Sequence, residues 1–184
     1  MPTINKNLFL GTIFGPYAIQ LVLGLAGLLL SLFGNDSLAV AALGLSCFSL
    51  IFAIVAIVMV AILVYKLWDS IQDGQARTTP GKACGFLFIP FFNFYWLFVA
   101  YLGWAKDFNA YAGERNIEGT RMNEGLTLAM CIFVVVSVLV SLIPFVGFLT
   151  GIVNAVLLFL FFSPAIDGAN AARALRVPAP EPQM

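Results

Sequence analysis

Residues 83–105 read ACGFLFIPFFNFYWLFVAYLGWA, an uncharged run that lies between Lys82 and Lys106. A helix that crosses about 30 Å of hydrocarbon needs about 20 residues, so this run is long enough to span a bilayer once. Pro90 and Asn93 interrupt it near its middle, where a continuous membrane helix disfavours them. The path of this stretch decides how the whole chain is threaded.

Aromatic side chains crowd this stretch and its continuation, with twelve of them between Phe86 and Tyr111. Trp and Tyr prefer the headgroup level of a bilayer, where the ring is apolar and its N–H or O–H stays hydrated. We therefore expect a re-entrant or interfacial helical element over residues 83–111. It has a short arm to Ile89, a break at Pro90–Asn93 and a helix from Phe94 to about Tyr111. A fifth, proline-kinked span is the alternative, because length and hydropathy alone favour it.

The distribution of basic residues tests these two paths, because Lys and Arg accumulate on the cytoplasmic side of short loops. If residues 83–105 span, the nine basic residues divide four against five between the two sides of the membrane. If the stretch enters and leaves on one side, all nine share a face and the opposite face carries only Asp36. The second arrangement follows the rule and predicts that both termini are cytoplasmic.

The composition of the whole chain is that of an integral membrane protein. Of 184 residues, 61% are hydrophobic and 10% are charged, and the mean hydropathy is +1.00. A soluble domain is usually about 45–50% apolar and about 25% charged, so a soluble fold and a disordered chain are both excluded. Nine Lys and Arg balance nine Asp and Glu, which gives no basic field that favours a nucleic-acid partner.

Charged residues and turn residues divide the rest of the chain into four predicted spans, near 17–33, 38–65, 125–143 and 145–163. Gly34 to Ser37 form a turn that joins the first pair, and Pro144 with Gly147 breaks a run twice as long as one crossing needs. We expect an all-α membrane protein with four transmembrane helices as two hairpins around the central aromatic element. Residues 1–176 form one polytopic domain, and 177–184 form a Pro-rich flexible tail.

The sequence offers contact residues but no chemistry-bearing constellation. Candidates for contact with lipid or a partner are Lys82, Pro90, Asn93, Tyr95, Trp96, Tyr101, Trp104 and Lys106. Candidates for helix packing are Gly11, Gly15, Gly147 and Gly151, at small-xxx-small spacing, and Asn154. The glycine pairs fit packing within one chain or a dimer seam. Histidine is absent, no metal-ligand spacing is present, and we expect no catalytic, metal or cofactor site.

The stretch TTPGKACGFLFIPFFNFYWLFVAYLGWAKDFN, Thr78 to Asn109, resembles a segment of uncharacterised bacterial integral membrane proteins, some of which carry a GYF-like domain. The shared phrase is TPGKAxGFLFIPFFNxYW followed by AKDxN. It covers about one sixth of this chain. The resemblance implies a multi-pass protein of the bacterial cytoplasmic membrane and transfers no activity, and we expect no soluble GYF-like part in this chain.

Three classes of function remain open from the sequence. The first is a non-enzymatic scaffold or accessory subunit of a membrane complex, with membrane lipids, itself or another membrane protein as partners. The second is an oligomeric channel or transporter with the Pro90–Asn93 break lining a pathway. The third is an enzyme with Asp69, Asp73 or Asp107 as acid or base. It ranks last, because no nucleophile, base and orienting group are visible together.

Overall fold

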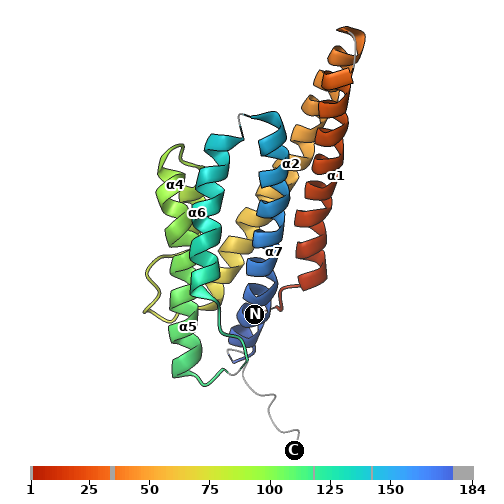
Figure 1. The fold of residues 1–184 in the computed structure, drawn as a ribbon. Coiled ribbons are helices and arrows are strands. Elements are labelled where there is room, and N and C mark those ends of the chain that lie inside the picture. Colours follow the sequence, from red (N-terminus) through yellow and green to blue (C-terminus); the bar gives the residue numbers. More distant parts are fainter. Residues whose placement is uncertain (1, 34–35, 118, 142, 176–184) are drawn as a thin grey trace, which may run out of the picture.

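The computed structural model describes residues 2–33, 36–117, 119–141 and 143–175. These residues form helices and loops with no strand among them, which confirms the all-α prediction. Four long helices form two antiparallel hairpins that lie side by side (Figure 1). The long helices are α1 (Lys6–Phe33), α2 (Asp36–Ser70), α6 (Glu124–Val140) and α7 (Pro144–Ala174). Between the hairpins the chain forms α3 (Pro80–Gly85), η1 (Phe86–Phe88), α4 (Phe92–Leu97), η2 (Phe98–Gly103) and α5 (Trp104–Glu114).

Three helical segments are long and apolar enough to cross a membrane: Lys6–Leu30, Cys47–Ser70 and Val146–Ala174. This confirms the coarse prediction of a multi-pass membrane protein. The fourth predicted span corresponds to α6, which is apolar but has 17 residues. At a rise of about 1.5 Å per residue it is about 25 Å long, somewhat short of the full hydrocarbon thickness.

The first two helices extend beyond the predicted spans. α1 begins at Lys6, and Pro16 lies inside it instead of preceding it. The turn before Pro16 is held by burial of Phe9 and Ile13, and proline is tolerated within membrane helices. α2 continues past Tyr65 because its last turns pack inward, where Leu67 and Trp68 are fully buried.

The last helix also continues, through Pro164 to Ala174. Beyond the proline, small residues face the interior and allow a close approach to α5: Ala165, Ala169 and Ala172 are fully buried. Gly168 lies directly against the ring of Phe108, which leaves no room for a Cβ atom. Interior packing therefore keeps helical a segment that the proline would otherwise end.

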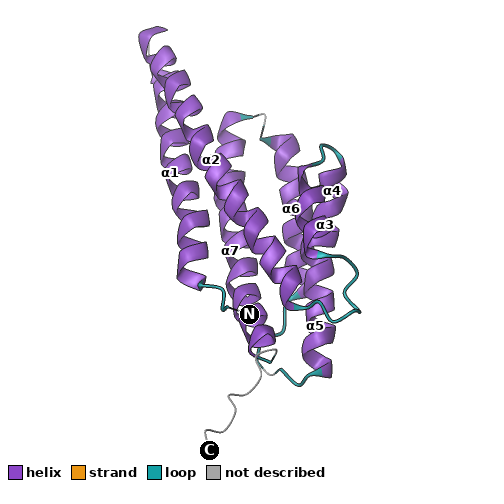
Figure 2. Ribbon diagram, turned by 180° about the vertical axis from the view of Figure 1, so that it is seen from behind, coloured by secondary structure: helices purple, strands orange, loops and turns teal. Residues whose placement is uncertain are grey.

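Residues 80–114 fold back on themselves, and we call them the aromatic hairpin. The indole N–H of Trp96 donates to the carbonyl oxygen of Ala83 at 3.1 Å, and the Phe86 and Trp96 rings lie 4.8 Å apart. Both flanks of the hairpin lie at the end of α2 (Figure 2). Gln72 donates to the carbonyl of Thr78 at 3.1 Å at one flank, and Arg115 pairs with Asp73 at 3.1 Å at the other.

The chain reverses through a tight turn at residues 89–91. Phe91 has φ 63° and ψ −43°, and the N–H of Phe92 donates to the carbonyl of Pro90 at 2.7 Å. These values describe a γ-turn, a strained conformation for a residue with a side chain. The predicted break at Pro90–Asn93 thus coincides with a backbone reversal, and the second helix begins two residues before the predicted Phe94.

The second arm of the hairpin, residues 92–114, is helical throughout but contains a widened π turn at η2. The indole N–H of Trp68 donates to the carbonyl of Ala100 within this turn at 3.0 Å. An extra residue in one turn rotates everything beyond it by about 100° around the helix axis. The sequence placed Tyr101 and Trp104 at a lipid or partner surface, whereas Tyr101, within this turn, and Trp104, directly after it, are both buried.

Charged side chains gather where α1 begins and where α2 and α7 end, which we call the polar end. Asn170 accepts from the N–H of Ile4 at 2.6 Å and donates to its carbonyl at 2.9 Å, so the N-terminal segment is fastened to α7. Lys6 pairs with Asp167 at 2.5 Å nearby. Hydrogen bonds and an ion pair at the polar end therefore connect the N-terminal segment and α1 to α7, which is distant in sequence.

Candidate functional site

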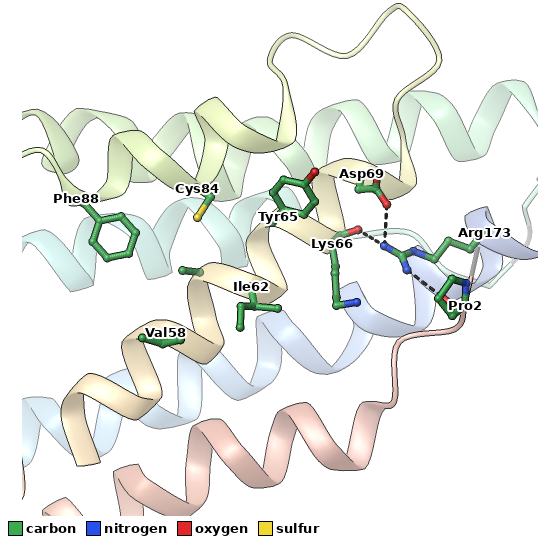
Figure 3. A pocket seen from close by; sticks show the side chains of 10 residues that line it. Pro2, Val58, Ile62, Tyr65, Lys66, Asp69, Cys84, Phe88 and Arg173 are labelled. Atoms are coloured by element: carbon green, nitrogen blue, oxygen red, sulfur yellow. Dashed lines mark hydrogen bonds and ion pairs between the residues drawn. The ribbon is translucent and has the colours of Figure 1, made fainter. Parts of the chain in front are cut away.

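A groove of about 470 Å³ opens beside α2 at the polar end, between α2 and the first arm of the aromatic hairpin (Figure 3). Its lining residues come from α2, the hairpin, α7 and the N-terminal segment: Pro2, Val58, Ala61, Ile62, Tyr65, Lys66, Asp69, Cys84, Phe88 and Arg173. Polar groups lie at the end nearest Arg173, and apolar groups continue toward Val58 and Phe88. The groove is therefore amphipathic along its length.

Arg173 forms the inner wall of the polar part, and its side chain is only 2% exposed. Its guanidinium donates to the carbonyl oxygens of Pro2 at 2.9 Å and Lys66 at 2.8 Å and to the Asp69 carboxylate at 3.2 Å. A buried arginine with a carboxylate and two carbonyl acceptors is well compensated for its desolvation. Its role here is structural, because it joins the N-terminal segment, α2 and α7.

Lys66 is the other cation of the groove and it is differently placed. Its carbonyl is occupied by Arg173, but its ammonium makes no ion pair with any residue in the described ranges. Lys66 comes directly after an uncharged stretch of α2 that ends at Tyr65, and the Tyr65 ring is exposed at the groove. A tyrosine next to a lysine at the end of an apolar run is typical of a membrane–water boundary.

A second cavity of about 600 Å³ lies between α1, α2 and the hairpin, and includes Asn93. The side chains of Tyr17, Gln20 and Tyr101 also line it. The Oδ1 atom of Asn93 is buried there and meets no hydrogen-bond donor within the part of the chain that the structure describes. Asn154 does not line this cavity. It donates to the hydroxyl of Ser137 at 2.8 Å and joins α6 to α7.

The three carboxylates considered as acid or base each pair with an arginine. Asp69 pairs with Arg173 and Asp73 with Arg115, and Asp107 accepts from Arg77 through both the guanidinium and the backbone N–H. These pairs join separate segments of the polar end. Among the described residues no group of three His, Cys, Asp or Glu side chains could hold a metal ion.

The remaining predicted contact residues lie on different faces. Lys82, Pro90, Tyr95 and Lys106 are exposed, and Trp96 is half-buried against Phe86 and Phe92. Two residues of the TPGKAxGFLFIPFFNxYW and AKDxN phrase make internal hydrogen bonds. Thr79 caps α3, and the Asn109 amide accepts from the N–H of Met122 at 2.8 Å and donates to its carbonyl at 3.0 Å.

The candidate packing glycines also divide into two groups. A Cβ atom at Gly11 or Gly15 would meet nothing within 4 Å, so these two positions are open on the surface of α1. At Gly147 it would lie 2.9 Å from the carbonyl oxygen of Ser141, and at Gly151 it would lie 3.4 Å from Leu21. The second pair therefore sits at close approaches within the chain.

The groove itself was not predicted from the sequence. Tyr65 followed by Lys66 at the end of an apolar run was a usable signal for its headgroup-level position. The contribution of Arg173 was not readable, because it depends on α7 continuing through Pro164.

Comparison with known proteins identifies no relative: no family model, no curated protein and no solved structure matches this chain. The fold itself defines the class, a multi-pass helical membrane protein with three helices long and apolar enough to span.

Proposed function

We propose that this chain is a non-enzymatic scaffold or accessory subunit of a complex in the bacterial cytoplasmic membrane. The aromatic hairpin dips into the bilayer from the cytoplasmic side and presents its tip to a partner. In this arrangement α6 is the fourth span, and both termini are cytoplasmic. The concentration of ion pairs at the polar end supports a position of that end at a membrane surface, since it needs water or headgroups.

The exposed tip of the aromatic hairpin is the observation that carries the proposal. The side chain of Phe91 is 85% exposed although its backbone is held in a strained turn. Its neighbours Phe88, Ile89, Phe92 and Tyr95 are exposed as well. Contiguous exposed aromatics mark a surface that contacts lipid or protein, and retained backbone strain is found mainly at functional positions. The paired carboxylates of the polar end favour a structural role for those residues over catalysis.

Photocrosslinking in cells tests the scaffold proposal. Benzoylphenylalanine at position 91 is expected to yield a protein adduct of discrete mass, either with a partner or with a second copy. The matched control is position 139, where Leu139 is also exposed but lies on the apolar surface of α6. Lipid adducts alone at both positions, together with a lone monomer in mild detergents, would refute the proposal.

Cysteine labelling tests the orientation. After replacement of the native cysteines, Gln75→Cys lies before the aromatic hairpin and Ala110→Cys lies near the end of its second arm. A membrane-impermeant maleimide is expected to modify both only after the cytoplasmic membrane is opened. Modification of one of them in intact cells would instead place the flanks on opposite sides.

A channel or transporter is the second candidate, favoured by the unsatisfied amide oxygen of Asn93 beside a cavity. A buried carbonyl oxygen without a donor is costly unless a ligand or water supplies one. Flux through liposomes that contain the purified chain tests this function. Flux that is present in the wild type and abolished by Asn93→Leu would support it, whereas flux that is absent, or unchanged by the substitution, would remove this mechanism.

A further inference from the structure

We infer that the groove beside Lys66 binds one acidic glycerophospholipid, with the lipid phosphate on the Lys66 ammonium and an acyl chain along Val58, Ile62 and Phe88. The inference rests on the proposed membrane embedding of α2, but not on the partner of the hairpin tip. It assigns a ligand class to a site that the scaffold function leaves unused.

The charges of the groove fit an anionic headgroup. Lys66, Arg173 and Asp69 are its charged lining residues, so their formal sum is one positive charge. The carboxylate of Asp69 is engaged by Arg173 at 3.2 Å, which leaves the Lys66 ammonium as the cation without an ion-pair partner in the described ranges. A juxtamembrane lysine attracts acidic lipids, and a phosphate oxygen would supply the missing counter-charge.

The length and openness of the apolar part fit an acyl chain. From Lys66 to Val58, α2 rises about 12 Å, which is most of the depth of one leaflet if the hydrocarbon core is about 30 Å thick. Val58, Ile62 and Phe88 are each exposed at the groove, so the chain enters sideways from the bilayer without a gate. Phe88 and Ala61 also line the neighbouring cavity, so the apolar surface continues beyond the groove.

Arg173 is not available to bind the lipid phosphate. Two backbone carbonyls and a carboxylate already receive its N–H groups, and its side chain is nearly inaccessible. Lys66 is instead a flexible cation at the groove, and in Figure 3 its ammonium and the Tyr65 hydroxyl point to different sides of α2. Headgroup recognition therefore depends on Lys66.

Native mass spectrometry of the full-length chain tests this site. The purified protein is titrated with phosphatidylglycerol and, separately, with phosphatidylcholine of the same acyl chains. We expect one tightly retained phosphatidylglycerol per chain and weaker retention of phosphatidylcholine. Lys66→Gln is expected to lower phosphatidylglycerol retention about fivefold, the effect typical of one lysine at an anionic membrane surface. Lys106→Gln is the matched control, since it removes the same charge from an exposed position outside the groove.

A second variant tests the apolar part independently. Ile62→Trp fills the groove while it keeps Lys66, and it is expected to lower phosphatidylglycerol retention as well. Equal losses in Lys66→Gln and Lys106→Gln would show unspecific surface attraction and overturn the proposal. Equal retention of both lipids, or a second copy of the chain in place of a lipid, would also overturn it. Crosslinking at position 91 reports separately on the scaffold function, so the two failures are distinguishable.

Discussion

Replacing Gly168 by alanine is expected to destabilise the protein, because this glycine lies against a ring that has nowhere to move. An added Cβ atom would lie 2.8 Å from Cε1 and 3.1 Å from Cε2 of Phe108, and closer still to Cζ. Phe108 is fully buried, and its ring is stacked on Trp104 with centroids 5.0 Å apart. Overpacking of such a site costs about 1–3 kcal/mol, and helix propensity returns about 1 kcal/mol.

The rigid surroundings favour the upper part of that range, so the free energy of unfolding is expected to fall by about 2 kcal/mol. Unfolding in mixed micelles by titration with dodecyl sulfate, followed by circular dichroism, measures it. Gly11→Ala is the control, because a Cβ atom there meets nothing within 4 Å. It should leave the unfolding free energy unchanged or raise it by up to about 1 kcal/mol.

A double variant tests whether the clash with Phe108 causes the loss of stability in Gly168→Ala. Phe108→Leu removes the clashing edge of the ring, so Gly168→Ala should cost less in that background than in the wild type. The difference is the coupling between the two positions. If Gly168→Ala is as stable as the wild type and shows no coupling to position 108, the close packing of α7 on α5 is not as the structure has it.

Two further predictions concern the polar end and the widened turn. Trp68→Phe removes the indole N–H that donates to the carbonyl of Ala100. The free energy of unfolding should fall by about 1–3 kcal/mol, measured by the same titration with dodecyl sulfate. A loss below about 0.5 kcal/mol would contradict a structural role for that hydrogen bond. The pKa of Asp73 is held below its usual value by the N–H of Gln75 and then by Arg115, so its stabilising contribution is present above the usual carboxyl pKa and is lost as the pH falls through the lowered value. Asp73→Asn should therefore flatten the acid limb of a stability profile, and a limb identical to that of the wild type would refute this assignment.

The helical class and an interruption of the central stretch were readable from the sequence. A long uncharged run with proline and asparagine in its middle predicts an interrupted helix, and the structure reverses the chain at residues 89–91. The predicted separation of α6 from α7 near Pro144 also agrees with the observed start of α7. These features depend on local residue types, which can be identified from the sequence alone.

The ends of the helices and the burial of the aromatics were not readable. Pro16 and Pro164 suggest boundaries locally, but packing of Ile13 and Ala165 on other elements keeps both segments helical. Trp104 resembles a headgroup-level residue by composition. It is buried directly after the widened turn, which no residue pattern in the sequence predicts. Tertiary contacts decided each of these points.

The π turn at η2 divides the second arm of the hairpin into two helical parts. The faces of these two parts are offset from each other by about 100° around the helix axis. Loss of a single residue from it would restore ordinary winding and swing Asp107 about 100° away from Arg77. A change of length within η2 would therefore alter the rotational position of α5 relative to α2.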